Sequence, residues 1–227
     1  MIVVVGSLAW RAAEPSGPVG RACAIALAAV ARGATVEVIG RAGDDPAGDA
    51  LLLALSRAGV GHAAVLRDPS RPTPIVAPAA EADDAASPFA EAAAGGTAGG
   101  ASAAPQAPRL EAADVMLAMR YLDPTGVLVV TDGVPLDVVA AAVDEGRFAG
   151  TRLVILLSPG TRPGGAVPAG VPADATVLAA PDESDAEPGA FEALVGAYAA
   201  ALDRGVAPEA AFASAAGAGW EALAGSD

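Results

Sequence analysis

An acidic run precedes a glycine turn and a predicted helix near the end of the chain, in the segment PDESDAEPGAFEALVGAY at residues 181–198. Four carboxylates stand within six residues there, and carboxylate oxygens are the ligands that a hard cation such as Mg²⁺ prefers. One hypothesis is therefore a metal site made by Asp182, Glu183 and Asp185. The alternative, which we favour, is a solvated acidic loop, because the whole chain already carries a formal charge of −14.

Two other groups of residues could suggest catalysis. Asp44 and Asp45 stand in GRAGDDPAG, where an Asp before Pro46 is typical of the start of a helix, so we predict a capping role. The single histidine, His62, directly follows the turn AGVG and is predicted to begin a strand rather than to serve a Ser-His-Asp triad. The glycines of this region do not form G-x-G-x-x-G after the first strand, so a dinucleotide site is not indicated.

The composition is that of an acidic chain whose core depends on aliphatic residues. It is 53% hydrophobic but only 4% aromatic, and its 13 basic residues are all arginine. The lack of lysine excludes a Walker-type phosphate loop and a Schiff-base mechanism. With a net charge of −14 and a pI of about 4.3, the chain is not expected to bind nucleic acid or an anionic membrane surface.

Three features predict a cytoplasmic protein. The only cysteine, Cys23, cannot form an internal disulfide, and we expect it to be a buried thiol because it lies in the apolar run ACAIALAAVA. That run is too short to span a bilayer and fits a core helix. The N-terminal MIVVVGS has neither the basic region nor the cleavage site of a signal peptide.

Predicted strands and helices alternate along most of the chain. Strands are predicted at residues 1–7, 35–43, 62–68, 73–78, 126–132, 152–160 and 175–183. Helices are predicted at residues 20–34, 44–60, 110–122, 135–150, 191–206 and 208–225. This alternation favours one α/β domain over residues 1–227, with a mainly parallel sheet covered on both faces. Residues 77–109 interrupt it with a low-complexity Ala/Gly/Pro/Ser sequence, where we expect a loop.

Several of these segments have the order of motifs of one enzyme family. TVEVIGRAGDDPAGDALLLALSRAGVGHAAVLRDPSRPT combines a strand, G-x-x-G-D-D-x-x-G, a helix, A-G-V, a further strand and a threonine. It resembles the N-terminal half of the PfkB-type, ribokinase-like carbohydrate kinases. VVVGS resembles their first strand, GVPLDVVAAAVDEGRFAGTRLVILLSPG a later strand–helix–strand unit, and PDESDAE their P-N-E-x-E segment. PGAFEALVGAYAAALDRGVAPEAAFASAAGAG resembles their closing stretch, so the resemblance implies a three-layer α/β/α sandwich.

The resemblance also implies phosphoryl transfer from Mg-ATP to a hydroxymethyl group of a sugar or nucleoside. In the family, the Asp of a G-A-G-D turn accepts the hydroxyl proton, and backbone N–H groups of the turn stabilise the moving phosphoryl group. Here the turn reads Gly189-Ala190-Phe191-Glu192. Glu192 keeps a carboxylate at the base position but displaces it by a methylene. Phe191 replaces a glycine that lets phosphate approach the backbone, and its ring would obstruct the anion site.

Other parts of the kinase pattern are shortened. Only Pro188 separates the acidic run from Gly189, where the family has a segment that builds most of the nucleotide site. At the sugar end, the resemblance places substrate-binding positions at Arg11, Gly17 and Ala22, which lack the family's Asp and Asn side chains. The short connection from Arg11 to Gly17 also predicts that no lid covers the substrate.

We therefore predict a ribokinase-like pseudoenzyme without kinase turnover, which binds a small molecule or a partner protein. Two alternatives stay open. The first is an active sugar or nucleoside kinase in which Glu192 serves as the base. The second is a protein-interaction module, because a shortened sheet exposes an edge or an apolar face that a second copy or another protein can cover.

Overall fold

A parallel six-stranded sheet forms the centre of the protein. The structure, a computed structural model, describes residues 1–76, 106–122, 124–158, 170–181 and 188–224. Every neighbouring pair of strands in this sheet is parallel, and the order is β5–β4–β1–β7–β8–β9. The strands are β1 (Ile2–Val5), β4 (Val36–Gly43), β5 (Val65–Asp68), β7 (Val127–Val130), β8 (Arg152–Leu157) and β9 (Thr176–Ala179).

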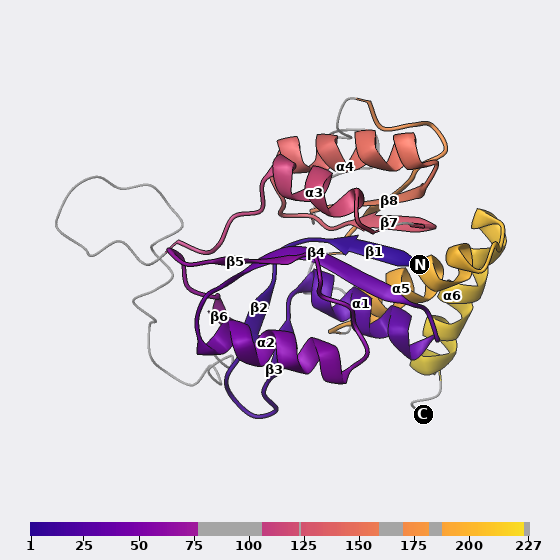
Figure 1. Cartoon of the computed structure of the whole chain (residues 1–227). Coiled ribbons are helices and arrows are strands. Elements are labelled where there is room, and N and C mark those ends of the chain that lie inside the picture. Colours follow the sequence, from indigo (N-terminus) through magenta and orange to yellow (C-terminus); the bar gives the residue numbers. More distant parts are fainter. Residues whose placement is uncertain (77–105, 123, 159–169, 182–187, 225–227) are drawn as a thin grey trace, which may run out of the picture.

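Helices cover both faces of this sheet (Figure 1). One face carries α1 (Arg21–Ala31), α2 (Pro46–Arg57), α5 (Ala190–Asp203) and α6 (Pro208–Ala224). The other face carries α3 (Ala112–Met119) and α4 (Leu136–Ala149). The predicted three-layer α/β/α fold with a mainly parallel sheet is therefore confirmed, and each predicted helix is present.

The central strands divide their side chains between two hydrophobic layers. On β1, Ile2 and Val4 pack toward α1 and α5, whereas Val3 and Val5 pack toward α3 and α4. Strands buried on both faces read as continuous apolar runs, which is why this one was recognisable. Cys23 of α1 is fully buried, as predicted, and its burial raises the pKa of the thiol to about 12.

A second, three-stranded sheet lies beside the first. Its order is β3–β2–β6, from β3 (Gly17–Val19), β2 (Ala9–Arg11) and β6 (Ile75–Val76). β2 pairs antiparallel with β3 and parallel with β6. β6 lies within the strand predicted at residues 73–78, whereas β2 and β3 were not predicted as strands. The expectation that no lid covers the substrate stays a prediction.

Two sequence predictions concern what lies around this fold. Of the low-complexity segment predicted at 77–109, residues 77–105 lie outside the described residues, so that expectation stays a prediction. As for the membrane, no helix in the described ranges combines the length and the apolar character that a crossing would require.

Candidate functional site

The strand order creates a topological switch at β1. From β1 the chain passes through α1 to β4 and β5 on one side, whereas β7, β8 and β9 lie on the other side. In open parallel sheets, ligands bind in the crevice at the carboxyl ends of the strands at such a switch. A cavity of about 190 Å³ opens at this place. It is lined by Ser7, Leu8, Ala9, Gly20, Arg21, Ala22, Pro74, Thr131 and Asp132.

Close packing of α1 against α5 brings the first turns of both helices to this edge of the sheet. Gly196 of α5 permits the approach, since a Cβ atom there would lie 2.6 Å from Cβ of Ala28 and 2.9 Å from the backbone nitrogen of Ala29. Each helix begins after a glycine with a positive φ, 96° at Gly20 and 83° at Gly189, and neither has a side-chain cap. The first turns of the two helices therefore meet.

Arg21, the first residue of α1, is the centre of a charged cluster beside the cavity. Its Nη1 lies 2.5 Å from Oδ2 of Asp132, and its Nε donates a 2.9 Å hydrogen bond to Oε1 of Glu192. The guanidinium carbon also lies 5.7 Å from the centre of the Phe191 ring, within cation–π range. The side chains of Arg21, Asp132 and Glu192 are only 21%, 13% and 15% exposed.

The two carboxylates fix the charge of this cluster. Burial of Arg21 by itself would lower the pKa of its guanidinium, but the hydrogen bonds and charges of Asp132 and Glu192 outweigh burial and raise that pKa. Arg21 therefore stays protonated. One positive charge faces two negative ones, and Asp132, which lines the cavity, offers carboxylate oxygens to hydroxyl or cationic groups.

The predicted catalytic turn forms the beginning of α5. Gly189 precedes the helix, Ala190 is its first residue, and Phe191 and Glu192 follow in its first turn. Phe191 is half-buried, packs against the core and lies beside the Arg21 guanidinium. Glu192 is bound to Arg21. Their family roles, the anion hole for the first three and the base for Glu192, stay predictions.

The predicted substrate positions do not come together. Ala22 lines the cavity and is buried. Arg11 and Gly17 instead face each other as a register pair between β2 and β3, and neither lines the cavity. The Nε of Arg11 donates a 2.9 Å hydrogen bond to the carbonyl of Pro15. Only one of the three positions thus belongs to the candidate site.

The predicted metal ligands Asp182, Glu183 and Asp185 lie outside the described residues. The metal site and the solvated acidic loop therefore both stay hypotheses. Among the residues that the structure describes, no group of three or more His, Cys, Asp or Glu side chains is arranged to hold a metal ion.

Three residues of the site were missed by the sequence analysis, although each carried a signal. Arg21 places a cation in the first turn of a helix, where the helix dipole disfavours positive charge and a carboxylate partner is to be expected. Thr131 and Asp132 directly follow the buried strand β7. Polar residues in that position lie at the edge where parallel sheets bind ligands.

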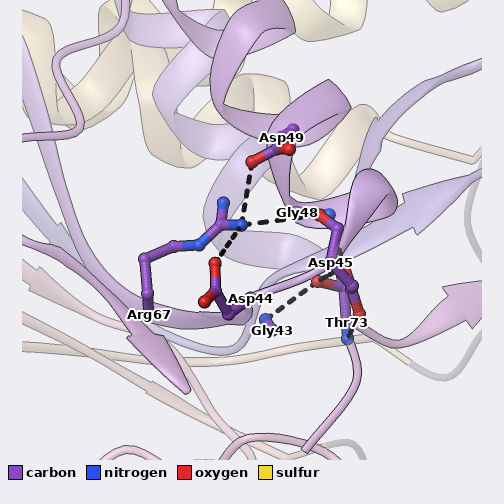
Figure 2. Close-up of polar contacts among 7 residues, drawn as sticks. All are labelled: Gly43, Asp44, Asp45, Gly48, Asp49, Arg67 and Thr73. Carbon is purple, nitrogen blue, oxygen red and sulfur yellow. Dashed lines mark hydrogen bonds and ion pairs between the residues drawn. The ribbon is translucent and has the colours of Figure 1, made fainter. Parts of the chain in front are cut away.

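A second polar cluster organises the turn between β4 and α2 (Figure 2). Oδ1 of Asp45 accepts hydrogen bonds from the Gly48 N–H at 2.7 Å and from the Thr73 hydroxyl at 2.8 Å. Oδ2 of Asp45 accepts the Thr73 N–H at 2.7 Å, and the Thr73 hydroxyl oxygen accepts the Gly43 N–H at 2.8 Å. Asp45 is the N-cap of α2, so its predicted capping role is confirmed.

Asp44 has a different place in the same turn. Its side chain is 64% exposed and lies 3.1 Å from the Arg67 guanidinium, which also lies 2.8 Å from Asp49 (Figure 2). Exposed pairs of this kind contribute little to stability. The two adjacent aspartates therefore have different roles: Asp45 forms hydrogen bonds within the turn, whereas Asp44 forms an exposed ion pair on its surface.

Comparisons with known proteins identify the fold. No family model and no curated protein sequence matches the chain. Among solved structures, a PfkB protein from Polaromonas sp. JS666 aligns with a TM-score of 0.65 and 16% identity, over 99% of this chain and 96% of that one. Arabidopsis thaliana ribokinase, complexed with ribose and ATP, aligns with a TM-score of 0.62 and 16% identity, over 96% and 90%.

A third structure gives a weaker match of the same kind. The fructokinase from Xylella fastidiosa, with bound ATP, aligns with a TM-score of 0.51 and 14% identity, over 94% of this chain and 64% of that one. Identities this low carry information about the fold alone. The chain has the ribokinase-like fold, as the sequence resemblance predicted.

Proposed function

We propose that this chain is a degenerate PfkB-type protein that binds a small, hydroxyl-bearing molecule at the carboxyl ends of β1 and β7 and does not transfer phosphate. The observation that carries the proposal is the pairing of Arg21 with both Asp132 and Glu192. This pairing places a cation of the protein itself against the carboxylate that a kinase of this fold would need as its base.

The pairing argues against turnover in two ways. A general base must have an oxygen within hydrogen-bond reach of the substrate hydroxyl, and the hydrogen bond from the Nε–H of Arg21 to Oε1 leaves only Oε2 of Glu192 for that task. The Phe191 side chain also stands where the family has a glycine, next to the start of α5. A ring at that position hinders the approach of a phosphoryl group to the backbone N–H groups.

The nucleotide side of the site supports the same conclusion. In the described part of the sheet, β9 is the outer strand, and all four of its residues are half-exposed. The chain passes from β9 to α5 with Pro188 alone between the acidic run and Gly189. The family places most of its nucleotide-binding segment at this point, so the sequence leaves little material for an adenine pocket.

The cavity suits a small ligand with hydroxyl groups. Its volume of about 190 Å³ is below the roughly 300 Å³ at which pockets for drug-sized ligands begin. Ser7, Thr131 and Asp132 offer hydroxyl and carboxylate oxygens, while Leu8 and Pro74 supply apolar walls. Because Asp132 lines the cavity and Glu192 shares its guanidinium partner beside it, an unphosphorylated sugar or nucleoside fits better than a sugar phosphate.

Thermal unfolding with ribose, fructose, adenosine or Mg-ATP tests the proposal. A ligand at about 100 times its dissociation constant adds roughly 2.7 kcal/mol, which raises Tm by about 5–10 °C in a domain of this size. We expect such a shift with a sugar or nucleoside and none with Mg-ATP. Asp132→Asn should abolish the shift, whereas Asp137→Asn, a matched change on the exposed side of α4, should preserve it.

A working kinase would give different results. ADP formation by the pure protein in the presence of a sugar or nucleoside, stopped by Glu192→Gln, would replace this proposal with an active enzyme that uses Glu192 as its base. In that case Phe191→Gly should leave the rate equal or raise it. A genuine rate that neither substitution changes would exclude Glu192 as the base.

Self-association is a second candidate function, favoured by an apolar groove of about 310 Å³ between α3 and the outer strand β5. Tyr121 and Leu117 beside it are 80% and 49% exposed, and exposed apolar surface of this kind often marks a protein contact. The groove is lined by Ala63, Ala64, Leu66, Asp114, Leu117, Ala118, Tyr121 and Leu122. Sedimentation that shows a strict monomer throughout the micromolar range would exclude a second copy as the occupant.

A further inference from the structure

We infer that the hydrogen bonds between Asp45 and Thr73 hold the small sheet in place beside the cavity, which makes both residues positioning residues for ligand binding. The binding part of this inference rests on the proposed function. The structural part does not, because the position of the small sheet can be measured without a ligand.

A short path of bonds connects Asp45 to the cavity wall. Asp45 binds both the N–H and the hydroxyl of Thr73. The next residue, Pro74, lines the cavity, and its carbonyl accepts the Trp10 N–H of β2 at 2.8 Å. Ile75 then begins β6 and pairs with Trp10. A movement of Thr73 would therefore move a wall of the cavity and a strand of the small sheet together.

β6 has little apolar burial that could fix its position. It is two residues long, and Ile75 and Val76 are 62% and 47% exposed. Thr73, just before it, is only 3% exposed and makes its polar contacts inside the protein. Hydrophobic stabilisation is proportional to the apolar area removed from water, so β6 gains little from it. The contacts of Thr73 are then the main anchor of this end of the small sheet.

The glycines around Asp45 leave room for this anchor. A Cβ atom at Gly43 would lie 2.4 Å from the backbone nitrogen of Thr73 and 2.6 Å from Oδ2 of Asp45. A Cβ atom at Gly48 would lie 2.9 Å from the Thr73 hydroxyl oxygen. Three residues of the motif GRAGDDPAG thus converge on one threonine, which follows Gly43 by 30 positions. Capping of α2 alone would require only the bond to Gly48.

Two variants separate this role from helix capping. Asp45→Ser keeps a good N-cap for the Gly48 N–H, but its single, shorter oxygen cannot also bind the Thr73 N–H. Thr73→Val keeps the shape of the side chain and removes the hydroxyl between Asp45 and Gly43. Asp44→Asn is the matched control, because it changes the neighbouring carboxylate, which points to solvent and Arg67.

Amide hydrogen exchange of the Trp10 N–H reports the position of the small sheet in the free protein. Loss of a hydrogen bond to a charged group should speed this exchange by about tenfold or more in Asp45→Ser and Thr73→Val. The amides of β1 should keep their rates, and Asp44→Asn should behave as wild type. Unchanged Trp10 exchange in both variants, or equal acceleration in β1, would overturn the inference.

Ligand affinity is the second measurement that tests the inference. Where wild type binds ribose, fructose or adenosine, Asp45→Ser and Thr73→Val should weaken binding by about tenfold, and Asp44→Asn should leave it unchanged. Wild-type affinity in both variants would overturn the positioning role, even if exchange is faster. If wild type binds none of the three probes, the proposed function fails, and the exchange rates alone decide whether Asp45 holds the small sheet.

Discussion

Two carboxylates lie at helix N-termini, Asp45 on α2 and Glu192 on α5, and they accept hydrogen bonds from different kinds of donor. Asp45 accepts two backbone N–H groups and one hydroxyl, all from neutral donors in its own turn and in the segment before β6. Glu192 accepts a hydrogen bond from the guanidinium of Arg21, which belongs to another helix. The first arrangement fixes the course of the chain, whereas the second neutralises a charge.

This difference extends to the glycines near the two carboxylates. Around Asp45, both the acid and the neighbouring glycines keep a structural use, since Gly43 and Gly48 leave no space for a Cβ atom. At the start of α5, Gly189 precedes the helix, Phe191 lies beside the guanidinium of Arg21, and Glu192 is hydrogen-bonded to it.

The largest expected effect compares a glycine from each region. A Cβ atom at Gly48 would lie 2.3 Å from the carbonyl oxygen of Gly43, which is backbone and cannot swing away. We expect Gly48→Ala to lower the free energy of unfolding by roughly 3 kcal/mol. At Gly189 a Cβ atom meets nothing within 4 Å, and only its φ of 83° is unfavourable, so Gly189→Ala should cost about 1 kcal/mol. Urea unfolding of both variants measures the two losses, and equal losses would contradict the contrast.

Arg21→Met tests the charge balance of the α5 region. The substitution keeps much of the side-chain volume but leaves Asp132 and Glu192 without their shared cation. We expect a loss of about 2–3 kcal/mol at neutral pH, somewhat less than for a fully buried pair, because these side chains are 13% and 15% exposed. Urea unfolding of the single variant measures it.

A triple variant provides the control for Arg21→Met. When Asp132→Asn and Glu192→Gln are added, no unpaired charge is left, and most of the lost stability should return. A triple variant no more stable than Arg21→Met alone would show that packing, not charge, explains the loss.

Much of the fold was predictable because its signals are local. The Val-rich run of β1 predicts a strand from four residues. The pair Asp45-Pro46 likewise predicts the start of α2. The small sheet was predicted only in part: β6 lies within the strand expected at residues 73–78, but the three-residue strands β2 and β3 carry no such signal, and neither does the pairing of β6 with β2. Pairing between short, distant segments leaves no periodicity in the sequence, so only the structure could reveal it.

The site was predictable in the same uneven way. The sequence placed Glu192 in the first turn of a helix, and it lies in the first turn of α5, while its role as a base stays a prediction. Arg21 was not predicted as a site residue. Its partner Glu192 is 171 positions away, and a sequence does not say which carboxylate an arginine will pair with. Arg11 was placed at the site by family position alone, yet it lies at the far end of β2, where it pairs with Gly17.

Acid should remove the stabilisation by Asp45. Burial by itself would raise the pKa of this carboxyl, but hydrogen bonds from Gly48 and Thr73 outweigh burial and lower it. A carboxyl with a lower pKa in the folded state stabilises the fold above its unfolded pKa of about 3.9, and this contribution is lost as the pH falls through the folded pKa. Asp45→Asn should therefore cost about 1–2 kcal/mol at neutral pH, and its difference from wild type should shrink at an acidic pH well below the unfolded pKa. Urea unfolding at both pH values measures it; a constant difference would mean that the carboxylate charge is not what stabilises the turn.

The smallest expected effect belongs to Asp44, the immediate neighbour of Asp45. Its carboxylate is 64% exposed and 3.1 Å from Arg67, which keeps a second partner in Asp49 when Asp44 is changed. Asp44→Asn should therefore alter the free energy of unfolding by less than about 0.5 kcal/mol, and added salt should reduce even that difference. Urea unfolding in low and high salt measures it. A loss as large as that of Asp45→Asn would show that the ion pairs on the outside of the turn, and not its inner hydrogen bonds to Thr73, hold the chain between β4 and α2.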